Sequence, residues 1–262
     1  MAVRAARVAS TLSAYVLHRY DWSESSLILD LFTREQGRIA AAAKGAKRPY
    51  SQLRSVLLPF QRIQVALGRV PKSERADESA SEVQNLRSAE WAGGPAMLTG
   101  AALFSGFYLN ELLMKLVARH DPHPALFDAY AETLPALARP DDAQVQAALR
   151  AFEVVLLKEV GVLPDLSVET STQQELRAEG AYALLPEAGV APARPNDTAI
   201  RGVVLIGLQA ALAHGSLPAL QQACTASLPE LKSTLRTLLH YHLGTPQLRT
   251  RQVMLDVQTL ER

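Results

Sequence analysis

The residues with the clearest chemistry are cations in the stretch GRIAAAAKGAKRPYSQLR, residues 37–54. The stretch has no acidic residue and surrounds a run of alanines with Arg38, Lys44, Lys47, Arg48 and Arg54. Lys and Arg side chains neutralise phosphates and release condensed counterions, which gives an affinity for polyanions that falls as salt rises. The pattern therefore predicts a phosphate-binding surface. The alternative is a solvated strand edge that its charge keeps soluble.

The charge of the whole chain hides this cluster, because 27 basic and 26 acidic residues give a formal net charge of +1. Residues 1–72 carry 12 basic and 4 acidic side chains, a net +8, and the rest of the chain carries a net −7. This asymmetry favours a polyanion-binding module joined to a module with another partner. Two solvated surfaces that merely differ in charge are the alternative.

Length and composition set ordinary bounds on the chain. At 262 residues and 48% hydrophobic content, it is long enough for two modest cores. No run of about 18 uncharged apolar residues predicts a membrane span, and polar residues interrupt any signal-peptide core near the N-terminus. A single cysteine, Cys224, excludes an internal disulfide and fits a reducing cytosol.

Short strands are the elements expected to position the cations. Leu27, Leu29 and Leu31 alternate with other residues at the strand period of two. Five such segments in about ninety residues predict a small closed barrel, and the OB-fold is the five-stranded barrel that often carries a nucleic-acid-binding face. The expected strands lie within residues 11–20, 25–33, 37–47, 59–68 and 81–91. The polar segment 69–80 is expected to be a mobile loop.

After Trp91 the apolar period becomes helical, which predicts a helix bundle. The expected helices lie within residues 97–116, 122–138, 141–161 and 227–244, the third with Asp141 or Asp142 as N-cap and Gly161 as its stop. Residues 164–200 are rich in proline and are expected to form an irregular or partly stranded insert. The prediction is an α+β protein with an OB-fold domain over residues 1–90 and a mainly helical domain over residues 91–262.

Several segments, in this order and spacing, resemble the RecO family of bacterial recombination mediators. They are YVLHRYDWSESSLILDLFTREQGRIAAAAKGAKRP, PFQRIQVALG, GFYLNELLMKLVARHDPHPALFDAY, ALRAFEVVLLKEVG and HYHLGTPQLRTRQVM. The resemblance implies a DNA-repair protein that binds single- and double-stranded DNA and anneals complementary strands. It also implies help, with RecR, in loading RecA onto DNA coated by single-stranded-DNA-binding protein (SSB). We therefore expect a cytoplasmic, nucleoid-associated protein.

Given this resemblance, the basic cluster is expected to contact DNA. The candidate contacts are Arg34, Arg38, Lys44, Lys47 and Arg48, followed by Arg62 and Arg69. Tyr20, Trp22 and Tyr50 are candidates for stacking on bases, whereas Tyr15 is expected to be a core residue.

The resemblance also implies a receptor for the acidic SSB tail, which ends in a phenylalanine carboxylate. Such a receptor needs an apolar pocket with a cation beside it, because a buried unpaired carboxylate is costly. Arg150 occupies the family's basic position, and the expected walls are Leu149, Val154, Leu112, Leu116 and Phe127. The alternatives are a surface ion pair of Arg150 with Glu153 or Glu111, and plain bundle core for the apolar residues.

No metal or other cofactor is expected. Some RecO proteins carry a four-cysteine zinc motif in the region of residues 164–200, where this sequence has no cysteine. His120 and His123 are expected to form a turn between helices rather than a metal site.

Two other function classes stay open at this point. One is an RNA-binding OB-fold module. The other is a hydrolase assembled from scattered residues such as His214 and Ser216, although the sequence has no recognisable P-loop, nucleophile elbow, zinc-protease or dinucleotide motif. The resemblance favours a binding protein over an enzyme.

Overall fold

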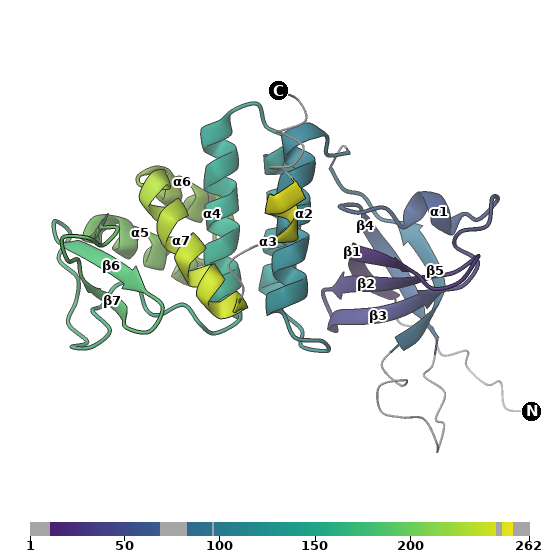
Figure 1. The fold of residues 1–262 in the computed structure, drawn as a ribbon, viewed down its shortest axis with the longest axis horizontal. Coiled ribbons are helices and arrows are strands. Elements are labelled where there is room, and N and C mark those ends of the chain that lie inside the picture. The colour runs from purple at the N-terminus through teal and green to yellow at the C-terminus, as the bar shows by residue number, and fades with distance from the viewer. Residues whose placement is uncertain (1–10, 69–82, 96, 245–247, 254–262) are drawn as a thin grey trace, which may run out of the picture. The chain divides into compact units, whose positions relative to one another are not determined.

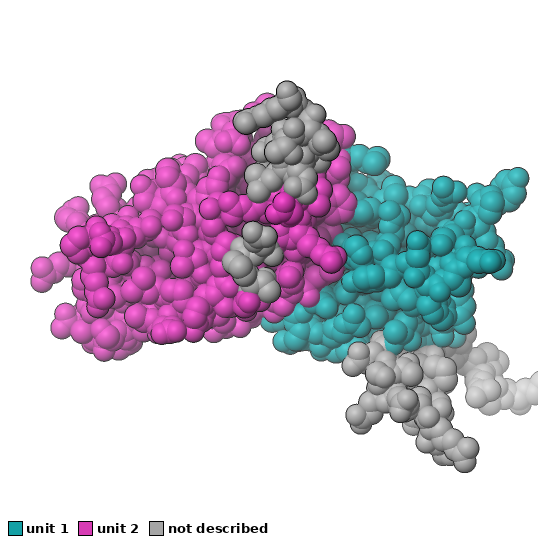
Figure 2. All heavy atoms as spheres, viewed as in Figure 1, with its two compact units in different colours: residues 1–97, 117–127 teal, residues 98–116, 128–262 magenta. Residues whose placement is uncertain are grey.

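The computed structural model describes residues 11–68, 83–95, 97–244 and 248–253. The chain divides into two compact units, which Figure 2 shows in different colours. The first, the barrel unit, comprises residues 1–97 and 117–127, and the second, the helical unit, comprises residues 98–116 and 128–262. The chain therefore returns to the barrel unit after leaving it. Arg69 and the expected loop 69–80 lie outside the described residues.

The barrel unit is a closed five-stranded barrel in the order β1-β2-β3-β5-β4, as the alternating pattern predicted (Figure 1). The β3–β5 pair is parallel, and the other neighbouring pairs are antiparallel. A short helix, α1, lies between β3 and β4 in the sequence, and the fold is an OB-fold. The strands and helix are β1(Thr11–Asp21), β2(Leu27–Thr33), β3(Gly37–Ala43), α1(Leu53–Val56), β4(Arg62–Leu67) and β5(Val83–Trp91).

The alanine run of β3 is explained by the inside of the barrel. Ala41 and Ala43 are fully buried in the same apolar cluster as Leu29, Leu31 and Ile39. Small side chains on one strand leave room for the leucines of its neighbour, because a small barrel is filled entirely by side chains. Ala41 and Ala43 thus belong to the barrel core, and the cations Lys44, Lys47 and Arg48 follow them in the sequence outside that core.

Residues 117–127 cover one side of the barrel. The Phe127 ring packs on the rings of Tyr15 and Phe32, with centroids 5.2 and 5.5 Å away. The backbone N–H of His120 donates to the carbonyl of Arg38, 2.9 Å away. Gly37, with φ +68°, lies against the Asp121 backbone, and a Cβ at this position would overlap the Asp121 carbonyl. Tyr15 is therefore a core residue, as expected.

The helical unit is built around α4, which packs against α6 and α7 (Figure 1). The Asp141 carboxylate caps α4 by accepting from the Ala143 N–H at 2.9 Å, as its sequence predicted. Helices α5 and α6 were not predicted, because α5 is apolar on every face and its glycines obscure the helical period. The helices are α2(Gly100–Leu116), α3(Pro124–Leu137), α4(Asp142–Glu159), α5(Gly202–His214), α6(Leu217–Thr225) and α7(Leu228–Leu243).

The proline-rich insert contains a small sheet in the order β7-β6-β8, in agreement with the partly stranded insert that was predicted. Its strands are β6(Ala181–Leu185), β7(Gly189–Pro192) and β8(Ile200–Arg201). Among the described residues, no helix combines the length and the apolar character needed to cross a membrane.

Candidate functional site

Arg38, one of the expected DNA contacts, is held inside the barrel unit. Its Nε lies 3.1 Å from Oδ1 of Asp30, and its Nη1 donates to the carbonyl of Val117 at 2.9 Å. Arg119 approaches the other carboxylate oxygen of Asp30 at 3.4 Å. Burial raises the pKa of Asp30 above its ordinary value, although Arg38, Arg119 and His18 oppose the shift. This arrangement gives Arg38 a structural role.

Arg62 is also engaged within the barrel unit. Its Nη2 donates to Ser13 Oγ at 3.2 Å, and its guanidinium carbon lies 5.9 Å from the centre of the Phe127 ring. This is within the range of a cation–π contact. Arg34 is exposed in the turn between β2 and β3.

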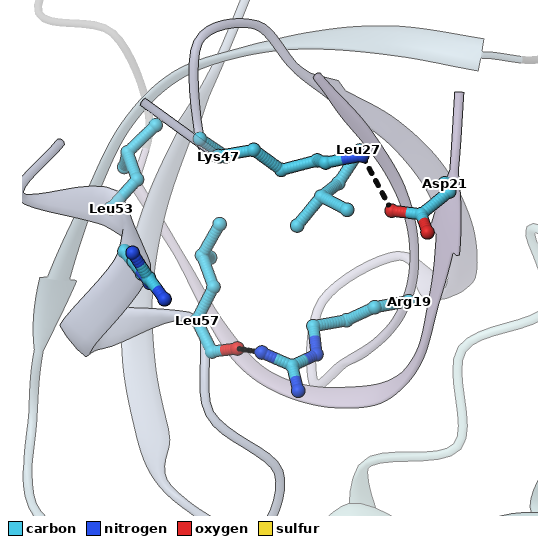
Figure 3. Close-up of a pocket in the computed structure, with 8 residues that line it drawn as sticks. Arg19, Asp21, Leu27, Lys47, Leu53 and Leu57 are labelled. Atoms are coloured by element: carbon cyan, nitrogen blue, oxygen red, sulfur yellow. Dashed lines mark hydrogen bonds and ion pairs between the residues drawn. The ribbon is translucent and has the colours of Figure 1, made fainter. Parts of the chain in front are cut away.

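The other expected cations follow β3 at its opposite end, where Lys44 and Arg48 are exposed. There Lys47 lines a cavity of about 390 Å³, which we call the barrel pocket (Figure 3). The residues that line it are Arg19, Asp21, Leu27, Ala46, Lys47, Leu53, Arg54 and Leu57. The structure thus adds Arg19 and Arg54 to the basic surface. Arg54 was part of the basic stretch but was not a candidate contact, and Arg19 is distant in sequence from that stretch.

Three contacts fix the shape of the barrel pocket. Lys47 Nζ lies 3.0 Å from Oδ1 of Asp21 and donates to the carbonyl of Ser23 at 3.1 Å. Arg19 Nη1 donates to the carbonyl of Leu57 at 3.3 Å (Figure 3). These bonds connect the end of β1, the turn after β3 and the end of α1.

Three aromatic rings near this end of the barrel are open to solvent. Tyr20, Trp22 and Tyr50 are 44%, 56% and 99% exposed. Exposed aromatic rings beside cations are the combination that binds single-stranded nucleic acids. Their exposure is compatible with the stacking role that the sequence suggested.

A second cavity, of about 310 Å³, lies in the helical unit and is called the helical pocket. Four cations line it, from α4, α7 and the segment after α7: Arg150, Lys232, Arg236 and Arg251. Its apolar walls are Phe104, Leu149, Leu239 and Leu248. Ser105, Tyr108, Gln146, His240 and Thr250 complete its lining. The pocket therefore combines apolar surface with an excess of positive charge.

Only two of the expected pocket residues line this cavity, Leu149 and Arg150. Val154, Leu112 and Phe127 are almost fully buried, and Leu116 is half-buried; none of the four is part of the cavity lining. Phe127 packs on the barrel strands instead. Its place in the expected pocket was wrong, because the chain returns to the barrel unit between α2 and most of α3.

Arg150 is buried and paired. Its Nη2 lies 2.6 Å from Oε1 of Glu153, and the Tyr108 hydroxyl donates to the same oxygen at 2.6 Å. Burial raises the pKa of Glu153 above its ordinary value, against the opposing charge of Arg150. The pair with Glu153 that the sequence offered as an alternative is present, but it is buried rather than on the surface. Glu153 therefore fixes the orientation of Arg150 at the pocket.

Glu111 holds the segment that forms one wall of the helical pocket. It accepts the N–H groups of Arg249 and Thr250, both at 2.9 Å, and the Thr250 hydroxyl at 2.7 Å. Burial favours the neutral acid, but the hydrogen bonds from Thr250 and Arg249, with the charge of Lys115, lower the pKa of Glu111 below its ordinary value. The ionised carboxylate thus anchors residues 248–251.

The other cations and apolar residues of the helical pocket were not predicted, because their signals in the sequence are weak. Lys232 and Arg236 lie four residues apart on α7 and therefore share one face of that helix. Leu248 and Arg251 follow the end of α7, where no periodic pattern marks them.

The histidines and the cysteine of the described chain do not form a metal site. Within the described ranges, no cluster of three or more His, Cys, Asp or Glu residues has the arrangement of a metal site. His120, with φ +58°, lies between α2 and α3, where a turn was expected, and His123 pairs with Asp121 at 3.3 Å. Cys224 is fully buried.

An OB-fold barrel followed by a helical unit with a cationic pocket defines a two-part protein of the OB-fold class. Comparison with known proteins narrows this class. Residues 8–77 match the family described as recombination protein O N terminal, and residues 97–252 match the family described as recombination protein O C terminal.

Curated relatives carry the same assignment over nearly the whole chain. A protein of Polaromonas naphthalenivorans is 52% identical and one of Polaromonas sp. strain JS666 is 50% identical, each over 94% of this chain and 96% of the relative. A protein of Albidiferax ferrireducens is 47% identical over 94% of this chain and 95% of the relative. All three are named DNA repair protein RecO. The chain belongs to the RecO family of DNA repair proteins, and its role lies in DNA repair and recombination.

Proposed function

We propose that this protein is a recombination mediator that binds single-stranded and duplex DNA and anneals complementary strands. The observation that carries the proposal is the group of cations at one end of the OB-fold barrel. Lys44, Lys47 and Arg48 follow β3, and Arg19 and Arg54 lie around the same pocket as Lys47. Cations on an OB-fold neutralise phosphates without reading sequence.

The proposed DNA-binding set is smaller than the sequence suggested. Lys44, Lys47 and Arg48 stay in it, with Arg34 at the other end of β3. Arg38 and Arg62 leave it, because their guanidinium groups are held inside the barrel unit, by Asp30 and by Ser13 and Phe127. Lys47 also has a carboxylate partner, but that partner, Asp21, is on the surface. Arg69 stays a proposal from sequence alone.

The helical pocket is the proposed receptor for the SSB tail. Phe104, Leu149 and Leu239 supply apolar surface for a phenylalanine ring, and Arg150 and Arg236 supply cations for its carboxylate. A guanidinium binds a carboxylate with two parallel hydrogen bonds. Lys232 and Arg251 add positive charge for the acidic residues that precede the ring.

The mediator role requires two further partners. We propose that the protein acts with RecR in the cytoplasm, and that RecA is loaded on the DNA once SSB has been displaced. Binding and base pairing drive annealing in this proposal, and no catalytic step is assigned to the protein.

The decisive experiment is annealing of complementary oligonucleotides that are precoated with SSB, with and without this protein. The proposal predicts faster annealing with the protein, and slower annealing for Lys44→Glu/Arg48→Glu at the same concentration. Equal rates with and without the protein would reject the mediator role. Affinities for single-stranded DNA, duplex DNA and structured RNA at matched salt test the RNA-binding alternative, which requires tighter binding of RNA.

A further inference from the structure

The barrel pocket combines two kinds of surface around one cavity. Arg19 on β1, Lys47 after β3 and Arg54 on α1 bring positive charge to it. The half-buried Leu27 and Leu53 bring apolar surface, with buried Leu57 behind them, and Figure 3 shows these three leucines with Arg19 and Lys47 around the same opening. Leu27, Leu53 and Leu57 belong to, or pack against, the apolar core of the barrel. A ligand that matches this lining needs an apolar part and an anionic part.

The barrel pocket has an excess of positive charge, which an anion would neutralise. Three cations face one carboxylate, Asp21, which pairs with Lys47 at 3.0 Å. Arg19 donates from Nη1 to the Leu57 carbonyl. For Arg54, no hydrogen bond or ion pair of the guanidinium is found within the part of the chain that the structure describes. Arg19 and Arg54 therefore have donors left for a phosphate group.

The size of the cavity indicates which kind of anion would fill it. Its volume of about 390 Å³ falls in the range of about 300 to 1,000 Å³ that is typical of small-molecule sites. An inorganic phosphate would leave the leucines uncovered. A nucleotide has a flat base for the leucines and a phosphate for the arginines.

We infer that the barrel pocket is a subsite for one unpaired nucleotide of single-stranded DNA, which it takes with its base against Leu27 and Leu53 and its phosphate near Arg19 and Arg54. The inference rests on the proposed DNA-binding function and makes it more specific. A base in a duplex is paired and stacked, so it reaches a pocket only after it leaves the helix. The subsite therefore adds affinity for single strands and none for intact duplex.

The test varies the pocket and the DNA together. Leu53→Trp fills the cavity without a change of charge, and Ser55→Trp places the same ring on an exposed position of α1 outside the cavity lining. Affinities are measured by fluorescence anisotropy for three DNA probes. They are an oligothymidylate of twelve nucleotides, an abasic strand with the same number of phosphates, and a duplex of equal length.

The inference predicts that Leu53→Trp weakens binding of the oligothymidylate by roughly fivefold or more, as expected for the loss of one apolar contact surface. Binding of the abasic strand and the duplex should not change, and Ser55→Trp should resemble the parent protein on all three. Equal loss on the oligothymidylate and the duplex would show a phosphate contact only and overturn the subsite. Unchanged binding of the oligothymidylate would also overturn it.

Two further measurements keep the test decisive. The first is the melting temperature of Leu53→Trp. If it is much lower than that of the parent, photocrosslinking of the parent to a strand that contains 4-thiothymidine is used in place of the variant. Crosslinks at residues of the barrel pocket support the subsite, and crosslinks confined to other surfaces reject it. A parent protein that binds none of the DNA probes rejects the proposed function itself, whereas failure of the subsite alone leaves DNA binding by the parent intact.

Discussion

The guanidinium of Arg38 lies 3.1 Å from the carboxylate of Asp30, and the two side chains are only 13% and 3% exposed. Asp30 on β2 faces Ala40 on β3, two residues beyond Arg38. Arg119, from the segment that returns to the barrel unit, contacts the same carboxylate. Arg38 thus stabilises the barrel unit by neutralising a buried charge.

Removal of Arg38 is expected to destabilise the protein. Arg38→Gln leaves Asp30 with Arg119 as its remaining strong partner, and the loss of one member of a buried ion pair costs about 3 kcal/mol. Urea unfolding measures the change, and DNA affinity corrected for the folded fraction should stay near that of the parent. The double variant Asp30→Asn/Arg38→Gln should recover part of the stability. Parent-like stability together with weak DNA binding would return Arg38 to the DNA-binding set.

Charge reversal at Lys44 and Arg48 is expected to weaken DNA binding without loss of stability. Both side chains are exposed. If both contact phosphates, the slope of log K against log salt should become shallower by roughly 0.7 per lost contact on single strands. Arg194→Glu/Arg201→Glu, at two exposed positions in the helical unit, is the matched double charge reversal. A slope that is unaltered in Lys44→Glu/Arg48→Glu would exclude both residues from the DNA path.

Loss of a cation from the helical pocket is expected to weaken binding of a synthetic SSB tail peptide. Arg236→Ala is a cleaner test than Arg150→Ala, because Arg236 is exposed whereas Arg150 neutralises buried Glu153. We expect roughly tenfold weaker peptide binding for Arg236→Ala by calorimetry, in the range for a charged hydrogen bond, and parent-like binding of naked DNA. We expect Arg150→Ala to weaken peptide binding sharply, spare naked DNA and also lower the melting temperature. Arg194→Ala is the control, and equal peptide affinity for Arg236→Ala and the parent would argue against the pocket.

The anchor at Glu111 is expected to depend on pH. Because its pKa in the folded protein is below the ordinary 4.5, ionised Glu111 stabilises the fold above that pH. This contribution is lost as the pH falls through the lower, folded pKa. Glu111→Gln should therefore cost about 2 kcal/mol near pH 7, the value for hydrogen bonds to a charged group, and progressively less below pH 4.5.

Urea unfolding of Glu111→Gln and the parent across this pH range measures the effect. Hydrogen exchange provides a second readout, with faster exchange of the Arg249 and Thr250 amides in the variant. A stability difference that does not depend on pH would show that the carboxylate charge is unimportant.

Cys224 is expected to be unreactive in the folded protein. Burial, with the nearby charge of Glu153, raises the pKa of its thiol to about 12, against the opposing charge of Arg150. The thiolate is the reactive form, so a disulfide reagent at pH 8 should label Cys224 only at the rate of unfolding. Rapid stoichiometric labelling of native protein would contradict the buried position.

The barrel was predictable from sequence because its pattern is local. Alternating leucines in β2, with Ala41 and Ala43 in β3, specify the inside of a small barrel. Asp141 predicted the start of α4 for the same reason. Helix α5 was not predictable in this way, since its exposed face carries apolar residues such as Val203, Ala210 and Ala213 and the helix has no clear apolar period to detect.

The pockets were less predictable, because each is lined by residues that are distant in the sequence. Lys47 and Arg54 come from one basic stretch, but Arg19 joins them only when β1 closes the barrel. Arg150 was found through family resemblance, whereas Arg251 reaches its pocket through the anchor at Glu111. No pattern in the sequence indicates that residues 117–127 return to the barrel unit. For this reason Phe127 was predicted in the wrong pocket.

That return has a consequence for the order in which the protein forms on the ribosome. The barrel strands end at Trp91, but the ring that covers Tyr15 and Phe32 belongs to Phe127. A nascent chain that has emerged only to residue 97 has all five strands without this cover and without Arg119. The N-terminal unit therefore matures only after about thirty more residues have been synthesised, and a fragment cut at the end of β5 would make an incomplete domain.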